Sequence, residues 1–124
     1  MINVLKAISE GMAVIGLNYA FAEWKDKPKY PYFVGEYQEA ASMTEDGMKE
    51  ATFILTGFTR KSWLELEEAK EKIEKHFNRI SGKIVTAEGS AVAIFYGSSL
   101  VVPTGDAELK KIQINLEVKE WKVI

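Results

Sequence analysis

The chain has 124 residues, of which 47% are hydrophobic, and a formal net charge of −2 at pH 7. This composition predicts a single domain over residues 1–124, able to bury roughly two thirds of its unfolded surface without disulfides or metal. The absence of cysteine excludes disulfides, thiolate metal sites and thiol nucleophiles, and the interspersed charges lack the basic patch typical of nucleic-acid binders.

The N-terminal segment is predicted to be a short helix over residues 2 to about 10. Val4, Leu5 and Ile8 form an apolar stripe at spacings of three and four residues. Gly11 is interpreted as the stop of this helix. The apolar run of residues 12–17 is shorter than the core of a secretory signal and far short of the ~20 residues that span a bilayer. We therefore expect a soluble chain without a cleaved leader.

Two strands are predicted next. Residues 19–24 alternate between two sets of side chains, and residues 26–29 form a polar connection. The aromatic segment from residue 30 to residue 37 favours extended backbone, and Pro31 suits a strand entrance because it lacks an N–H. The second of these strands is therefore expected to run from Tyr32 to about Ala40.

A long antiparallel hairpin is predicted around the sequence Glu45-Asp46-Gly47. Asp-Gly readily supplies the positive-φ positions of a tight turn. Met48 to Thr59 follows as a long apolar strand with residues 53–55 at its centre. The tip of the hairpin is expected to be acidic.

The clearest helix begins at Ser62. The Ser62 hydroxyl can accept from the N–H of Glu65, and the Glu65 carboxylate can reach back to the N–H of Ser62, which makes a capping box. Gly82 is the expected stop. An apolar stripe lines one face of this helix: Trp63, Leu66, Ala69, Ile73, Phe77 and Ile80.

Three further segments complete the predicted sheet. Residues 83–87 and 91–96 read as strands, and residues 97–106 read as a mobile loop in which residues 100–102 could pair briefly. The last strand alternates strictly from Ile112 to Val118, and its phase slips near Glu120, which predicts a bulge there.

The order of elements predicts an α+β fold: a mostly antiparallel sheet covered by one long helix, with a short N-terminal helix. The residues expected in the core are Phe53, Leu55, Leu66, Ile73, Phe77, Ile114 and Leu116.

The sequence contains no convincing set of catalytic groups. His76 is the only histidine and lies on the long helix beside Phe77. The glycine-serine pairs lack the context of a nucleophile elbow, and no phosphate-binding loop is present. Glu36 and Glu39 could act as acid and base, but nothing in the sequence brings them together. The sequence therefore predicts no enzyme, no metal and no cofactor.

The pattern as a whole resembles a known family. It combines a short first helix, a Pro-Tyr-Phe-Val strand at residues 31–34, the acidic turn at Asp46-Gly47 and an apolar strand at residues 51–59. A Leu-, Ala- and Ile-rich helix, the loop at Val102-Pro103-Thr104 and an alternating last strand follow. This order resembles the tail terminator, or tail completion, proteins of long-tailed bacteriophages and prophages.

The resemblance implies a virion structural protein that assembles with itself into a ring, usually of six subunits. Such a ring caps the tail tube, contacts the tail-tube and head-connector proteins, and lets DNA pass only as cargo. It implies location in the virion, with assembly in the host cytoplasm and no membrane. Two alternatives stay open: a small protein-binding adaptor domain, and a small ligand-binding α+β domain with a pocket between helix and sheet.

The candidate contacts with other subunits or partners lie in the acidic hairpin and in the glycine-rich loop. Both segments are polar, and such segments often become ordered on a partner. Aromatic residues between positions 24 and 37 are interpreted either as core or as contact anchors. The candidate interface residues are Glu39, Glu45, Asp46, Ser98, Ser99 and Asp106.

Overall fold

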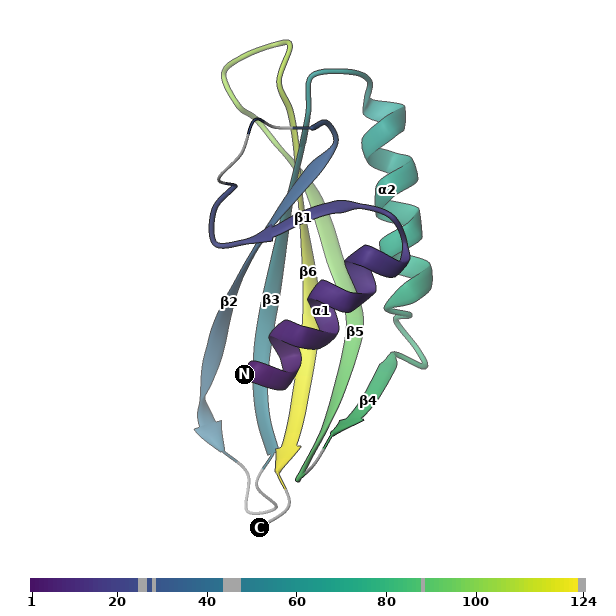
Figure 1. The fold of residues 1–124 in the computed structure, drawn as a ribbon. Coiled ribbons are helices and arrows are strands. Elements are labelled where there is room, and N and C mark those ends of the chain that lie inside the picture. The colour runs from purple at the N-terminus through teal and green to yellow at the C-terminus, as the bar shows by residue number, and fades with distance from the viewer. Residues whose placement is uncertain (25–26, 28, 44–47, 88, 123–124) are drawn as a thin grey trace.

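The computed structural model describes the chain except for residues 25–26, 28, 44–47, 88 and 123–124 (Figure 1). The described residues form two helices and six strands. Their bounds are α1 (Ile2–Val14), β1 (Asn18–Phe21), β2 (Tyr32–Met43), β3 (Met48–Thr59), α2 (Trp63–His76), β4 (Lys83–Ala87), β5 (Ser90–Val102) and β6 (Lys110–Lys122).

The six strands form one sheet in the order β1-β2-β3-β6-β5-β4. β1 runs parallel to β2, and the other neighbours are antiparallel. The sheet curls into a half-barrel, and both helices pack on its concave side (Figure 1). We call the end with the β3–α2 and β5–β6 connections the upper end. The end with the β4–β5 turn is the lower end.

The predicted fold class is wrong in its architecture. The chain is mainly sheet, and α1 and α2 are both short, with 13 and 14 residues. No long helix covers the sheet in the described part of the chain. Instead the curled sheet wraps around the two helices, because its strands are twisted and its concave face carries large apolar side chains that both helices must cover.

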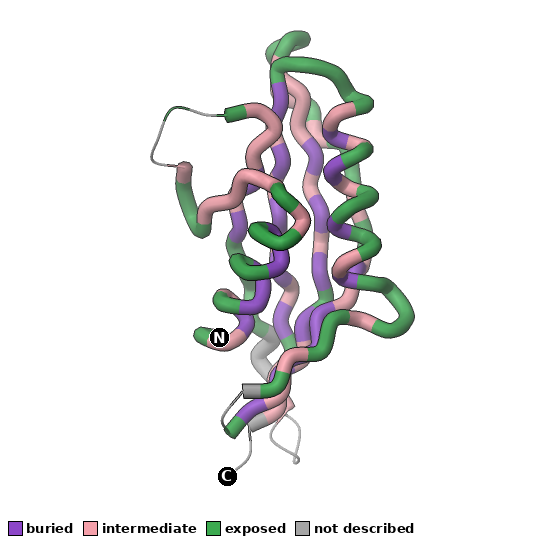
Figure 2. The backbone as a smooth tube through the Cα atoms, turned by 45° about the vertical axis from the view of Figure 1, so that its right-hand side comes forward, coloured by how far each residue is buried: buried purple, intermediate pink, exposed green. Residues whose placement is uncertain are grey.

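The core lies between this concave face and the helices. β3 buries every second residue from Ala51 to Thr59, and β6 does so from Ile112 to Glu120, as a strand with one covered face requires (Figure 2). All seven predicted core residues are fully buried, which confirms that prediction. The helices contribute Val4, Ala7, Ile8, Met12, Leu66, Ala69 and Ile73.

The first helix continues past its predicted stop. Gly11 lies inside α1, where a Cβ would approach Cζ of Phe77 to 2.7 Å and Nε2 of His76 to 2.9 Å. Gly11 is therefore a close-contact position between the end of α2 and α1, and the helix ends only at Val14. Neither described helix is long and apolar enough to cross a membrane.

The second helix begins as predicted and ends early. The N–H of Glu65 donates to Oγ of Ser62 at 3.3 Å, while the Glu65 carboxylate accepts from the hydroxyl of Thr59 at 3.0 Å. The helix ends at His76, and the Asn78 side chain accepts from two backbone N–H groups beyond it. Ile80, a predicted member of the apolar stripe, lies beyond this end and is 90% exposed. Trp63, at the first position of the helix, is 43% exposed.

The predicted loop at residues 97–106 is partly wrong. β5 continues to Val102, and its pairing with β6 shifts by one residue between Tyr96 and Ser98. The bulge predicted in the last strand near Glu120 is wrong, because β6 stays in unbroken register with β3 as far as Trp121. Glu120 is buried, 3.4 Å from the N-terminal nitrogen of Met1.

Candidate subunit interface

The predicted interface residues do not form one patch. Glu39 is exposed on the lower half of β2. On the upper half of β5, Ser98 is exposed and Ser99 is half-buried. Asp106 is exposed in the β5–β6 connection at the upper end. Glu45 and Asp46 lie outside the described residues. The described candidates therefore mark the two opposite edges of the sheet and its upper end.

The first edge of the sheet has a step. β1 pairs with Tyr32–Gly35 of β2, and no described strand lies on its other side. Below Gly35 β2 itself becomes the edge. The rings of Phe21 and Tyr37, 42% and 39% exposed, stack at this step with their centroids 6.0 Å apart.

A groove of about 430 Å³ lies between α1 and β1 beside this step. It is lined by Leu5, Lys6, Ser9, Glu10, Tyr19, Ala20 and Phe21. Desolvation raises the pKa of Tyr19 to about 12, because burial disfavours its charged form. The groove is therefore mainly apolar, with one charge of each sign at its rim.

The opposite edge also has a step. β4 pairs with Ser90–Ile94 of β5, and the N–H of Tyr96 donates to the carbonyl of Phe77 at 2.9 Å. Above this point, Ser98–Val102 has β6 on one side and no described strand on the other. Leu100 and Val101 in this stretch are 48% and 58% exposed. An open edge of this kind is a template for pairing with another chain.

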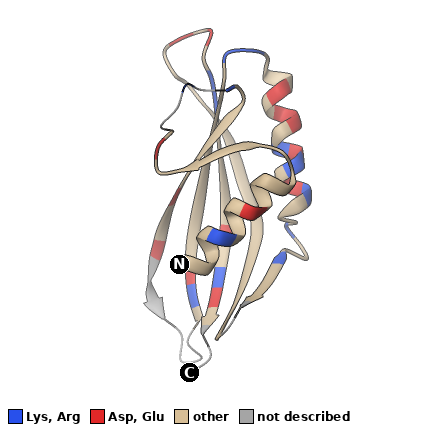
Figure 3. Cartoon of the chain, viewed as in Figure 1, with Lys and Arg blue, Asp and Glu red and all other residues tan. Residues whose placement is uncertain are grey.

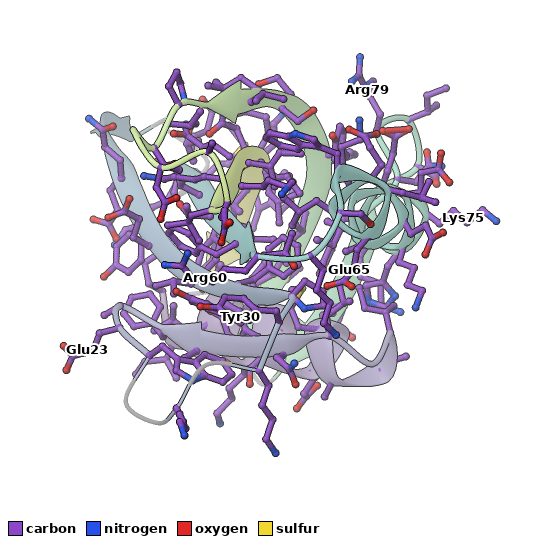
Figure 4. The ribbon with its side chains drawn as sticks, turned by 90° about the horizontal axis from the view of Figure 1, so that it is seen from above. Glu23, Tyr30, Arg60, Glu65, Lys75 and Arg79 are labelled. Atoms are coloured by element: carbon purple, nitrogen blue, oxygen red, sulfur yellow. The ribbon has the colours of Figure 1, made fainter. Side chains whose placement is uncertain are left out.

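Charge differs between the two edges. Glu36 and Glu39 are exposed along the lower half of β2, whereas Lys83 is exposed on β4 (Figure 3). Seen from above, Lys75 and Arg79 project outward near α2, and Glu23 projects outward on the other side of the molecule (Figure 4). The exposed charges on the lower half of β2 are thus acidic, and the one exposed charge on the described residues of β4, Lys83, is basic.

An aromatic cluster occupies the upper end of the convex face. The ring of Tyr32 lies 5.1 Å from Phe58, 5.3 Å from Trp24 and 5.6 Å from Tyr30, measured between centroids. Lys111 lies over Phe58, with its Nζ 5.5 Å from the ring centroid. The cluster members are half-buried, so they fix the segment before β2 to the ends of β3 and β6.

Asp106 is held by its own chain. Its Oδ1 accepts from the N–H of Glu108 at 3.0 Å, and its Oδ2 lies 3.2 Å from Arg60. The Glu108 bond and then Arg60 lower the pKa of Asp106. Arg60 lies near Tyr30, and the interaction with Tyr30, followed by that with Asp106, raises the pKa of Arg60 (Figure 4). Asp106 is therefore already paired within its own chain, although its side chain stays 48% exposed.

No catalytic arrangement is found among the described residues. Glu36 faces the convex side of the sheet, and Glu39, three residues further along the strand, faces the opposite side. The two carboxylates therefore do not converge. Glu36 also lies away from the helices, which excludes it from a pocket between helix and sheet. Burial, followed by the charge of Lys83, lowers the pKa of the half-buried His76. The described part of the chain contains no group of three or more His, Asp or Glu residues suited to a metal.

The sequence predicts β4 correctly, but it predicts only part of the open stretch of β5 above it. The strand was predicted to end at Tyr96, because Gly97-Ser98-Ser99 has the composition of a loop. The apolar run Leu100-Val101-Val102 was the available signal for a continued strand. Lys83 carries no sequence signal of its own, since its importance depends on the place of β4 at the edge of the sheet, which sequence order does not reveal.

Comparison with known proteins identifies a shared fold. No family model matches the chain, and no curated protein matches it in sequence. A chain of a solved structure described as the virion of a native gene transfer agent particle is similar, with a TM-score of 0.64 and 12% sequence identity. The match covers 94% of this chain and 88% of that chain. At this identity the likeness demonstrates a common fold over nearly the whole length of both.

Proposed function

We propose that this protein is a virion structural protein of the tail terminator type. It forms a ring, caps the tail tube and joins the tube to the head connector. The observation that carries the proposal is the fold shared with a chain of a gene transfer agent virion over 94% of this chain. The resemblance in sequence order to tail terminators, found independently, supports the same class.

The described surface supports a role in assembly and not in catalysis. Two opposite edges of the sheet are open, and exposed apolar side chains lie along both. Each edge offers main-chain groups for pairing, which is how many chains add to one another. We accordingly propose that the protein acts without enzymatic turnover and has itself, the tail-tube protein and the head-connector protein as partners.

The proposed location is the virion, with assembly in the host cytoplasm. DNA would meet the ring only as cargo, and the net charge of −2 favours this because like charge discourages adhesion of phosphates. A protein-binding adaptor is the second candidate, since the same open edges could add a strand from an unrelated partner. Neighbouring genes for capsid, connector and tail-tube proteins favour the terminator, and their absence favours the adaptor.

The experiment is a mass measurement on purified protein, alone and mixed with tail-tube protein. The proposal predicts a discrete oligomer that forms alone or on tube ends. A monomer that never binds tube protein contradicts it.

A further inference from the structure

The two edges of the sheet are complementary in shape. At the upper level the sheet contains β1 but not β4, and at the lower level it contains β4 but not β1. On one side of the sheet the upper level extends one strand further than the lower level, through β1. On the other side the lower level extends one strand further than the upper level, through β4. A copy placed beside this one, in the same orientation, would set its projecting β1 into the recess above β4.

The open strands also lie at the same height. Following the register across the sheet, Ala20 of β1 shares a row with Val34, Thr56, Gln113 and Leu100. By the same route Phe21 shares a row with Ser99, and Asn18 with Val102. The open edge of β1 and the open stretch Ser99–Val102 are thus equal in length and level.

The strand directions suit pairing between copies. β1 runs parallel to β2 and β6, and β5 runs antiparallel to β6, so β1 and β5 point in opposite directions. Two copies related by rotation about an axis along the strands keep these directions. Their adjoining β1 and β5 would be antiparallel, which is the pairing that a short ladder forms most readily.

The charges agree with this arrangement at the lower level. The row of Glu39 passes through Ala51, Val118 and Ile94 and ends at Lys83. Glu39 and Lys83 are exposed on opposite edges, so neighbouring copies at one level would bring a carboxylate beside an ammonium group.

We propose that β1 of one copy pairs antiparallel with Ser99–Val102 of the next, with Glu39 of the first copy beside Lys83 of the second. The inference rests on the proposed function, because it specifies the contact that builds the ring. Since the joined rows are level, successive copies are related by rotation without a rise. Head-to-tail contacts of this kind form a ring when the rotation divides a full turn, and the absence of a rise disfavours a helical filament.

Cysteine cross-linking tests the pairing directly, since the natural chain has no cysteine. In the double variant Ala20→Cys/Leu100→Cys, the two positions are separated within one copy by β2, β3 and β6. Across the proposed contact they face each other at a distance that a disulfide spans. Oxidation should give a ladder of covalent multimers on a non-reducing gel, ending at the ring size. The mismatched control Ala20→Cys/Ile84→Cys joins different levels and should give no ladder.

Charge exchange provides a second, independent measurement. Glu39→Lys and Lys83→Glu should each weaken self-association about fivefold, as expected for an exposed ion pair, and the double exchange should restore it. Glu71→Lys, at an exposed position on α2, is the matched control and should leave association unchanged.

The outcomes separate the inference from the function. Rings that cap tubes without the Ala20–Leu100 ladder overturn the proposed pairing and leave the function intact. Ladders ending at a ring size in a protein that never binds tubes support the pairing and overturn the function. Equal cross-linking in the mismatched control overturns the pairing.

Discussion

Gly11 and Phe77 bring the two helices into contact: a methyl group at Gly11 would lie 2.7 Å from the ring of Phe77, which is fully buried. The chain therefore has a glycine inside a helix where helix propensity alone would favour alanine. Because both helices cover the same concave face, this contact determines how closely they can approach each other.

The Gly11→Ala variant tests this contact through the sign of its effect. Helix propensity predicts a gain of about 1 kcal/mol, whereas overpacking a buried site costs about 1–3 kcal/mol. We expect net destabilisation, measured as a lower urea midpoint. Ser9→Ala, at an exposed position of α1, is the control and should have a small effect. A Gly11→Ala protein more stable than the wild type would contradict this account of the contact.

Phe77 and Ile80 form a matched pair for measuring burial. Both belong to the apolar stripe predicted from the sequence, but Phe77 is fully buried and Ile80 is 90% exposed. Phe77→Ala should lower the free energy of unfolding by about 3–5 kcal/mol, and Ile80→Ala should change it by less than about 0.5 kcal/mol. Equal losses in the two variants would mean that α2 continues beyond His76.

Glu120 provides a test of buried charge. Its side chain is 2% exposed and lies 3.4 Å from the N-terminal nitrogen of Met1. Removing one member of such a pair leaves the other charge buried, so Glu120→Ala should cost about 3 kcal/mol in thermal or urea unfolding. Glu117→Ala, exposed on the same strand, should cost little. A loss at Glu117 as large as that at Glu120 would be inconsistent with this interpretation.

The pH dependence of stability should include a contribution from His76. Its pKa is lowered in the folded protein, so between the folded value and the unfolded value near 6.5 the unfolded chain binds more protons. This contribution is present above pH 6.5 and is lost as the pH falls through the folded pKa. Titration of the His76 ring by NMR should give a pKa below 6.5, and His76→Gln should flatten the acid side of the stability profile. A ring pKa above 6.5 would reverse the sign of this prediction.

The parts of the fold that depend on local pattern could be predicted from the sequence. β3 begins at Met48 and ends at Thr59, as predicted from the Asp-Gly turn signal and the apolar run that follows it, and Ser62 caps α2 with its hydroxyl. Tyr32 begins β2 directly after Pro31. In each case the residues that determine the element are neighbours in the chain.

The parts that depend on tertiary contact could not be predicted in this way. Gly11 has the composition of a helix stop, and only the approach of Phe77 explains its place inside α1. Gly97 has the composition of a loop, but a strand with a bulge absorbs it because β6 supplies a continuous partner. The steps at the two edges of the sheet, one formed by β1 and one by β4, follow from the order of the strands. No local sequence pattern encodes this order.

The most direct test of the proposed function is electron microscopy of tail tubes mixed with the purified protein. The account predicts a ring of uniform size on one end of each tube, and tubes that stop growing once it has bound. Bare tube ends beside a protein that stays monomeric at every concentration tested would contradict it.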